Sequence, residues 1–243
     1  MKKILPVLLL LFSPALAEGA ACTTGTIGAY TCVQANGNTT GTTSTTVALT
    51  NHAAGNLLAV FYTVADSNAS VTLTITNTQG YTWSNAIGPV RRTGNTVWSE
   101  IFYTVIPSGF TGTDTITCAD ATATGSLCLA AELNGTRTTT PLDGTGGSAT
   151  GTSTTPATGN YTVTTGSLAF GGTNGSGGIS AGSGWSAIFT TAGMLIQAQV
   201  AASTTVNSTA SQPASNPWVA LGTGFLSNAA AATVVPQHHG GVW

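Results

Sequence analysis

Few residues in this chain could act as a nucleophile and its base. Ser180 lies in the sequence Gly-Ile-Ser-Ala-Gly, which matches the G-x-S-x-G pattern of a serine nucleophile. That pattern requires a helix after the serine, whereas here the chain continues into another strand-like run. The histidines that could serve as the base are His52, His238 and His239, and the last two lie near the end of the sequence. A hydrolase is therefore the third hypothesis, and no catalytic residue is predicted.

Carboxylates provide a second kind of candidate chemistry. Glu100 and Glu132 fall in neighbouring predicted strands and could form the acid and base of a glycosidase. If Cys118 pairs directly opposite Cys128, Asp114 faces Glu132. Two facing carboxylates are unfavourable unless a cation lies between them, so the alternatives are a calcium-type site and a bulge or solvated pair. No Asp-x-Asp-x-Asp-Gly loop accompanies them, which favours the second; no metal and no cofactor is predicted.

Aromatic side chains provide a third possibility, because aromatic faces stack on sugar rings. Such a platform requires several rings exposed in one plane on a sheet face or loop rim. The same residue types at strand ends are more commonly core fillers. The candidate glycan-stacking residues are Tyr81, Trp83, Trp98, Trp185 and Trp218.

The four cysteines predict disulfides. Cys22 and Cys32 would close one short loop, and Cys118 and Cys128 would close another. The alternative is that one cysteine of each pair joins the N-terminal segment to the later strands. No C-x-x-C spacing indicates a zinc site.

Residues 1–17 have the pattern of a signal peptide: Lys2 and Lys3 precede a short apolar run, and Ala15-Leu16-Ala17 is a small-x-small cleavage site. A lipid attached at Cys22 is a weaker alternative, because the usual aliphatic residue is missing. No later stretch is long and apolar enough for a membrane helix. We therefore expect a secreted protein, extracellular or at the cell surface, with no membrane insertion after signal removal.

Charged residues are scarce. The chain has five Lys and Arg against seven Asp and Glu, and removing the leader leaves only Arg91, Arg92 and Arg137 as basic side chains. Three arginines cannot neutralise a phosphate backbone or dock on anionic lipid, which argues against nucleic-acid partners. The surface should instead consist of Thr, Ser, Asn and Gly.

The elements that would position these residues read as β-strands throughout. Residues 96–106, 113–118 and 127–133 are rich in strand formers and are separated by turn formers, so they predict a three-stranded meander. Residues 56–66 form the most apolar strand, with apolar side chains on both faces. Its second face should be covered by loops or by another subunit. The candidate self-association residues are Leu58, Val60, Tyr62 and Val64.

Altogether the sequence predicts an all-β protein, an antiparallel β-sandwich of jelly-roll or immunoglobulin-like kind with about nine to eleven strands. Residues 18–46 are expected to be a partly ordered leader or an edge strand. Residues 47–226 would form the sandwich, with a polar crossover at residues 134–159. Residues 227–243 would be a C-terminal tail.

Three local phrases carry a resemblance: Gly55-Asn56-Leu57-Leu58, Pro141-Leu142-Asp143 and Gly182-Ser183-Gly184-Trp185. They resemble a widespread group of bacterial secreted β-sandwich proteins of unassigned function, over most of residues 47–226. The resemblance implies fold and export and transfers no active site.

The leading hypothesis is a non-enzymatic extracellular structural protein that associates with copies of itself, as a subunit of a fibre, pilus-like filament, surface layer or matrix, or as an adhesive module. Scarce charge and a doubly apolar strand motivate it. The alternative is a carbohydrate-binding module whose partners are surface glycans.

Overall fold

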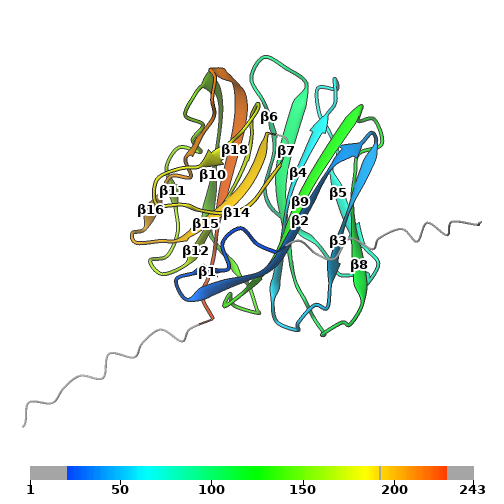
Figure 1. Ribbon diagram of the computed structural model, residues 1–243, viewed down its shortest axis with the longest axis vertical. Helices are drawn as coiled ribbons and strands as arrows, with labels where there is room; N and C mark the ends of the chain where they lie inside the picture. Colours follow the sequence, from blue (N-terminus) through cyan, green and yellow to red (C-terminus); the bar gives the residue numbers. More distant parts are fainter. Residues whose placement is uncertain (1–20, 192, 229–243) are drawn as a thin grey trace, which may run out of the picture.

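Three antiparallel sheets stacked face to face form the molecule (Figure 1). The structure is a computed structural model that describes residues 21–191 and 193–228. Within these ranges there is no helix, and the predicted all-β antiparallel sandwich is confirmed. The described residues form eighteen strands rather than nine to eleven, because several are two-residue pairings within loops.

The three layers differ in size. The first is a seven-stranded sheet in the order β14 (Ser186–Thr191), β15 (Met194–Val200), β12 (Leu168–Asn174), β18 (Asn216–Phe225), β10 (Leu142–Ser153), β11 (Tyr161–Thr162) and β16 (Thr205–Val206). The middle layer is a six-stranded sheet in the order β1 (Thr26–Ile27), β2 (Tyr30–Gly41), β9 (Gly125–Asn134), β4 (Leu57–Ala65), β7 (Val97–Val105) and β6 (Ser84–Arg91). The third layer contains β3 (Ser44–Thr50), β8 (Thr113–Ala119) and β5 (Thr74–Asn77), and a separate pair joins β13 (Ser180–Ala181) to β17 (Ala210–Ser211).

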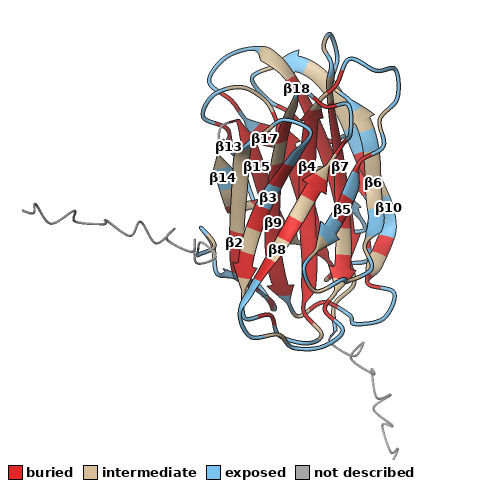
Figure 2. Cartoon of the chain, turned by 90° about the vertical axis from the view of Figure 1, so that its right-hand side faces the viewer, coloured by how far each residue is buried: buried red, intermediate tan, exposed pale blue. Residues whose placement is uncertain are grey.

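Strand β4 is apolar on both faces because both faces are covered by this chain. Phe61 points into the core between the middle and seven-stranded sheets, where it meets Phe170 and Leu221 among others. The opposite face packs against the three-stranded sheet, including Ile116 of β8. Figure 2 shows the buried central strands behind this third layer. Burying each large apolar side chain contributes about 1.5–3 kcal/mol, so the third sheet adds a substantial second core.

This arrangement corrects both alternatives for the second face of β4, loops or another subunit, because a third sheet of the same chain covers it. The sequence suggested a two-layer sandwich, and the third layer was not expected. The four residues assigned to self-association are fully buried inside the monomer and present no surface to a second copy: Leu58, Val60, Tyr62 and Val64.

The predicted strands at 96–106, 113–118 and 127–133 exist as β7, β8 and β9, but the meander is wrong. β7 pairs with β4 and β6, and β9 pairs with β2 and β4. β8 pairs with β3 and β5 in the third layer. Consecutive strands therefore belong to different sheets, because covering the second apolar face of β4 takes precedence over local hairpin pairing.

Both local disulfides are confirmed. Cys22 joins Cys32 across a Cα–Cα distance of 6.1 Å. Cys118 joins Cys128 across 6.3 Å, and since β8 and β9 lie in different layers this bond ties the third sheet to the middle sheet. The two disulfides indicate a protein that folds in an oxidising environment.

The N-terminal segment belongs to the sandwich, so a boundary at residue 47 is too late. β2 is a twelve-residue strand of the middle sheet, which agrees with the edge-strand alternative. Side-chain amides of β2 also donate to backbone carbonyls of β3: Gln34 to Thr50 at 2.6 Å, Asn36 to Ala48 at 2.9 Å and Asn38 to Thr46 at 3.0 Å. These bonds satisfy carbonyls on the open edge of the third sheet.

The predicted crossover at residues 134–159 is shorter than expected: the chain passes from the middle sheet to the seven-stranded sheet between β9 and β10, and most of the range is β10, which pairs with β18. Its Gly, Ser and Thr composition hid the strand. Two glycines have a physical reason: a Cβ on Gly147 would lie 2.8 Å from the ring of Tyr161, and one on Gly146 would lie 2.7 Å from Ile87. Only a strand without these side chains can pack so closely.

None of the described residues forms a helix suited to crossing a bilayer. The predicted signal peptide at 1–17 and nearly all of the predicted tail at 227–243 lie outside the described residues.

Candidate functional site

The most distinctive surface feature is the hairpin between β6 and β7. The two strands pair at Arg91 and Trp98, and the Arg92 N–H donates to the Val97 carbonyl at 2.8 Å to close the turn. Gly94 adopts a φ of 74°, the left-handed region that glycine enters readily. β6 extends as far as Arg91, and Arg92 is the next residue after it.

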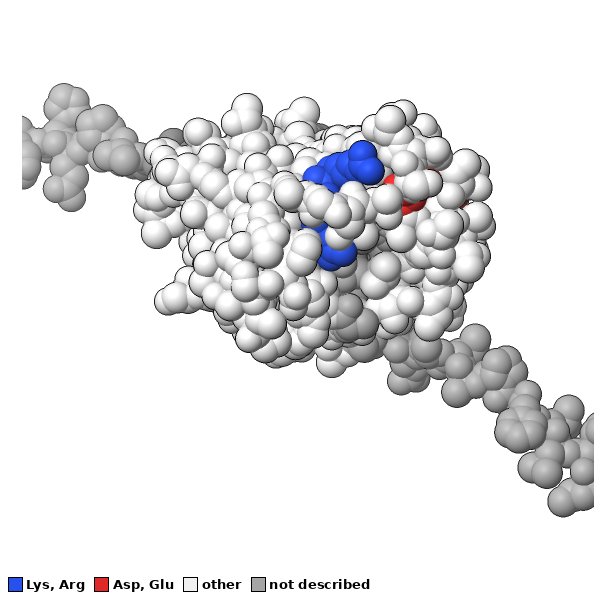
Figure 3. Space-filling view, turned by 90° about the horizontal axis from the view of Figure 1, so that it is seen from above, with Lys and Arg blue, Asp and Glu red and all other residues white. Residues whose placement is uncertain are grey.

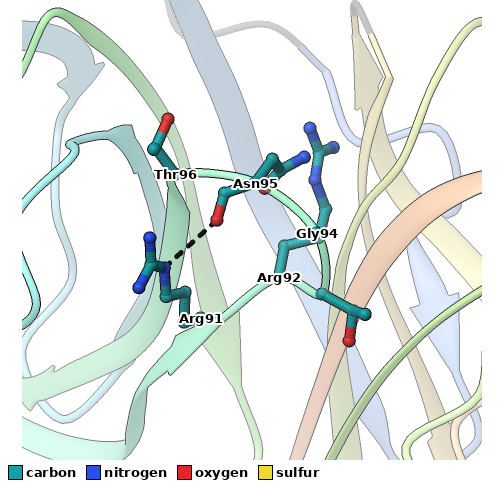
Figure 4. Close-up of a pocket in the computed structure, with 6 residues that line it drawn as sticks. Arg91, Arg92, Gly94, Asn95 and Thr96 are labelled. Atoms are coloured by element: carbon teal, nitrogen blue, oxygen red, sulfur yellow. Dashed lines mark hydrogen bonds between the residues drawn. The ribbon is translucent and has the colours of Figure 1, made fainter.

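The two arginines of this hairpin lie in different surroundings (Figure 4). Arg91 is exposed; its Nε donates to the Asn95 carbonyl at 3.1 Å, and its guanidinium lies 5.6 Å from the centre of the Trp98 ring. Arg92 reaches towards the seven-stranded sheet, where Nη1 donates to Asn174 Oδ1 at 2.8 Å. Its Nε is buried without a hydrogen-bond partner, and burial lowers the pKa of Arg92. An arginine nevertheless stays charged in a protein, so this end of the molecule has two positive groups.

An open surface pocket of about 460 Å³ lies at the hairpin. Its lining combines guanidinium donors with hydroxyl, amide and backbone groups: Arg91, Arg92, Thr93, Gly94, Asn95 and Thr96. The volume is within the range of small-ligand sites. Guanidinium groups favour carboxylate, sulfate or phosphate oxygens, so the arrangement can bind an oxygen-rich anion.

Carboxylates are almost absent from the described surface. All six Asp and Glu side chains in the described ranges belong to buried residues, which are at most 7% exposed: Asp66, Glu100, Asp114, Asp120, Glu132 and Asp143. Viewed from the hairpin end, the surface shows arginine as blue patches with only a small acidic area beside them (Figure 3). The chain is formally acidic, yet its described surface displays positive charge.

The buried acids include a cluster centred on His52. Its Nδ1 lies 2.8 Å from Glu132 Oε2, and its Nε2 lies 3.2 Å from Asp114 Oδ2. Burial alone would lower the pKa of His52, but hydrogen bonds and charge interactions with Asp114 and Glu132 outweigh it and raise the pKa to about 9. At neutral pH the ring is therefore an imidazolium held between two carboxylates.

This cluster answers the question that the sequence raised about Asp114 and Glu132. The carboxylates do approach each other, although they lie on β8 and β9 in different sheets, and the cation between them is His52. Burial raises the pKa of both carboxyls, but hydrogen bonds led by the one to His52 lower it overall. Neither the calcium-type site nor the solvated pair is present here.

Neighbouring polar groups complete this cluster. Glu132 also accepts from Gln34 Nε2 and Asn56 Nδ2, each at 2.6 Å. Asp114 accepts from Asn77 Nδ2 at 2.8 Å and from Thr78 Oγ1 at 2.7 Å. His52 and both carboxylates are buried and fully engaged in these hydrogen bonds, so the cluster stabilises the contact between layers.

The structure does not bring together the residues of the predicted serine hydrolase or of the predicted glycosidase pair. Ser180 lies on the short strand β13, where its hydroxyl is 2.7 Å from that of Ser211, and no helix follows it. Glu100 and Glu132 lie on β7 and β9 with β4 between them, opposite Tyr62 and Leu58 respectively. Two strand spacings and a four-residue offset separate them by about 16 Å, further than a glycosidase pair requires. His238 and His239 lie outside the described residues.

The predicted sugar platform is not assembled. Trp98 on β7, Trp185 in the loop before β14 and Trp218 on β18 are each at most 9% exposed, which corrects their assignment as glycan-stacking residues. Tyr81 and Trp83 are half-buried and pack against the second core. The five rings therefore do not form one exposed platform.

Sequence reasoning missed both the arginine hairpin and the His52 cluster as sites. The available signals were the adjacency of two of the three arginines in the predicted mature chain and a single histidine upstream of the tail in a chain with few charges. Within the part of the chain that the structure describes, no group of three or more His, Cys, Asp or Glu side chains is arranged to hold a metal ion.

Searches for similar proteins found no matching family model, no matching curated protein and no matching solved structure.

Proposed function

We propose that this chain is a secreted, non-enzymatic adhesive module that binds an acidic sugar at the hairpin formed by residues 91–96. The observation that carries the proposal is the charge distribution: all described carboxylates are buried, while two of the three described arginines meet at one hairpin beside a 460 Å³ pocket. Export rests on the leader pattern at residues 1–17, and the two disulfides support it.

The lining of the pocket matches the chemistry of such a ligand. A uronic or similar acid would place its carboxylate against a guanidinium, a pairing that charge-assisted hydrogen bonds favour. Thr93, Asn95 and Thr96 offer hydroxyl and amide groups to the sugar hydroxyls. Because the described carboxylates are buried, a second copy of this chain has no described acidic group to offer the arginines. A foreign acidic partner is therefore favoured over self-pairing.

Two features support a binding role over a catalytic one. His52 and the carboxylates nearest to it are committed to a buried, fully bonded cluster. The hairpin pocket is lined by arginine, threonine, asparagine and glycine, which are suited to binding and carry no base of neutral pKa.

The test is the binding of the mature protein to galacturonic acid oligomers and to neutral galactose oligomers of equal length, measured by isothermal titration calorimetry. We expect binding of the acidic oligomers that weakens as salt rises, and a loss of about tenfold or more in R91Q/R92Q, since each charged hydrogen bond is worth about 1.5–3 kcal/mol. R137Q is the matched control and should bind like wild type. Equal affinity for neutral oligomers, or unchanged affinity in R91Q/R92Q, would refute the proposal.

Self-association is the second candidate, favoured by a described surface with little charge to keep copies apart. It no longer draws on the buried face of β4, and Val33 is the one large apolar side chain exposed among the described residues. Light scattering after size exclusion tests it directly. Oligomers or filaments at high concentration would support this candidate, and a strict monomer would remove it.

A further inference from the structure

Two buried carboxylates approach each other near the arginine hairpin. Asp66 follows β4 and Asp120 follows β8, and both meet the hydroxyl of Thr122. Thr122 Oγ1 lies 2.6 Å from Asp66 Oδ2 and 3.1 Å from Asp120 Oδ1, so these carboxylate oxygens are less than about 6 Å apart. A hydroxyl has one proton and can donate to only one of them.

No positively charged side chain of the described residues pairs with these two carboxylates. In the described ranges the ion pairs are those of His52, and neither Asp66 nor Asp120 contacts an arginine within ion-pair distance. Asp66 accepts hydrogen bonds from the Asn68 backbone N–H at 2.7 Å and from the Thr122 hydroxyl at 2.6 Å, and Asp120 accepts from the Thr122 backbone N–H at 3.0 Å. These donors to the two carboxylates are therefore neutral groups.

An independent observation points to a ligand. Asp120 is only 4% exposed, and its Oδ2 is buried without a hydrogen-bond partner. A buried carboxylate oxygen without a donor is costly, so its persistence calls for a cation. Asp120 and Thr122 also line a cavity of about 650 Å³ between the β8–β9 and β4–β5 loops, which gives an ion a route of entry.

We propose that Asp66, Asp120 and Thr122 form a calcium site. Two carboxylates and a hydroxyl supply oxygen ligands, and water would complete the six to eight oxygens that calcium takes. Calcium–oxygen distances of 2.3–2.6 Å place ligands on opposite sides of the ion about 5 Å apart, which suits the spacing of this pair. Magnesium is disfavoured because it demands a near-ideal octahedron.

The site also bears on the hairpin. The Asp66 N–H donates to the Thr96 carbonyl at 2.7 Å, and the Asp120 N–H donates to the Thr43 carbonyl at 2.9 Å. A bound ion would link the loops after β4 and β8 and fix the strand end beside the hairpin. With only two charged ligands, we expect a weak site with a Kd of about 10⁻⁴–10⁻³ M, as in other extracellular modules.

The experiment is thermal unfolding of the mature protein after EDTA treatment and dialysis, with 0–10 mM CaCl₂ or MgCl₂. Calcium should raise the Tm by roughly 3–5 °C and magnesium by less. The D120N and D66N variants should lose this shift. E100Q, which removes a buried carboxylate elsewhere in the middle sheet, should retain it.

Terbium supplies a second readout if D120N or D66N fails to fold. T122V removes an oxygen ligand without changing the charge of the site. Its affinity for terbium, measured by luminescence titration, should be about tenfold weaker than that of E100Q. A wild-type Tm that does not move with calcium, or a calcium shift that survives in D120N, D66N or T122V, would overturn the assignment. Because neither readout uses a sugar, failure here is distinct from failure of the adhesive function.

Discussion

The described residues include two pairs of buried carboxylates, and one member of each pair lies at an end of strand β8. At its start Asp114 approaches Glu132, and His52 lies between them as a cation. Just past its end Asp120 approaches Asp66, and a neutral threonine hydroxyl lies between them. One pair therefore carries its positive charge within the chain, and the other leaves a carboxylate oxygen without a partner. The difference separates a completed structural cluster from a site that can still take a ligand.

Glu100 is a buried carboxylate that belongs to neither pair and has no cation within ion-pair distance among the described residues. Burial raises its pKa to about 7, and the hydrogen bond from Asn85 only partly opposes this effect. The three cases indicate three outcomes for a buried acid: an internal cation, a proton, or an ion from solution.

Removing the internal cation should have the largest effect on stability. H52Q should lower the free energy of unfolding by about 3–5 kcal/mol, because it leaves two buried carboxylates without their counter-charge. Urea unfolding at pH 6 measures this. Adding D114N should recover part of the loss, whereas D120N in the H52Q background should recover none; equal effects of the two additions would contradict the assignment.

The disulfide beside these clusters should have the next largest effect. C118S/C128S is expected to cost about 2–4 kcal/mol, since the bond ties the third sheet to the middle sheet. The matched control is C22S/C32S, whose bond does not join these two layers. Hydrogen exchange should show faster exchange in β8 in the first variant only. Equal protection of β8 in both variants would argue against a tie between layers.

The pH dependence of stability tests the contribution of the charged His52 cluster. The pKa of His52 is raised from its ordinary 6.5 to about 9, so its contribution is complete below pH 6.5 and is lost as pH rises through 9. The loss should reach roughly 3 kcal/mol at most, and H52Q should abolish this alkaline limb. The pKa values of Asp114 and Glu132 are lowered, so their contribution is present above pH 4.5 and falls as they protonate. An alkaline limb that persists in H52Q would contradict the proposed role.

Substituting Glu100 should change stability least, and it should stabilise the protein, whereas the preceding variants destabilise it. The pKa of Glu100 is raised, so the protein loses stability as pH rises from 4.5 through 7. E100Q should therefore stabilise the protein by roughly 1–2 kcal/mol at pH 8 and leave it unchanged near pH 4. Paired urea titrations at the two pH values measure this. A destabilised E100Q at pH 8 would show that the ionised form has a partner after all.

The sequence was informative where a strand has a strong apolar pattern. Residues 56–66 predicted β4 and its two apolar faces, and the cysteine spacing predicted both disulfides. The sequence could not tell what covers the second face of β4, because β3, β5 and β8 are short and threonine-rich and their pairing is decided by distant partners. The glycine-rich β10 looked like a crossover for a related reason, since its small residues serve close packing rather than strand propensity.

The carboxylate clusters, too, could be predicted only in part from the sequence. Asp114 and Glu132 were placed together by an incorrect register, and the requirement for a cation between them held even though the register did not. His52 was considered only as a base for Ser180, because its loop gave no periodic pattern. The pairing of Asp66 with Asp120 depends on where two loops end, which strand patterns do not specify.

A buried carboxylate pair should persist in this fold only with positive charge beside it. The most direct test is an NMR titration of the His52 ring from pH 5 to 10. We predict that both ring nitrogens carry protons at pH 7 and that the pKa lies near 9. A ring that is neutral at pH 7, with a pKa at or below 6.5, would contradict it.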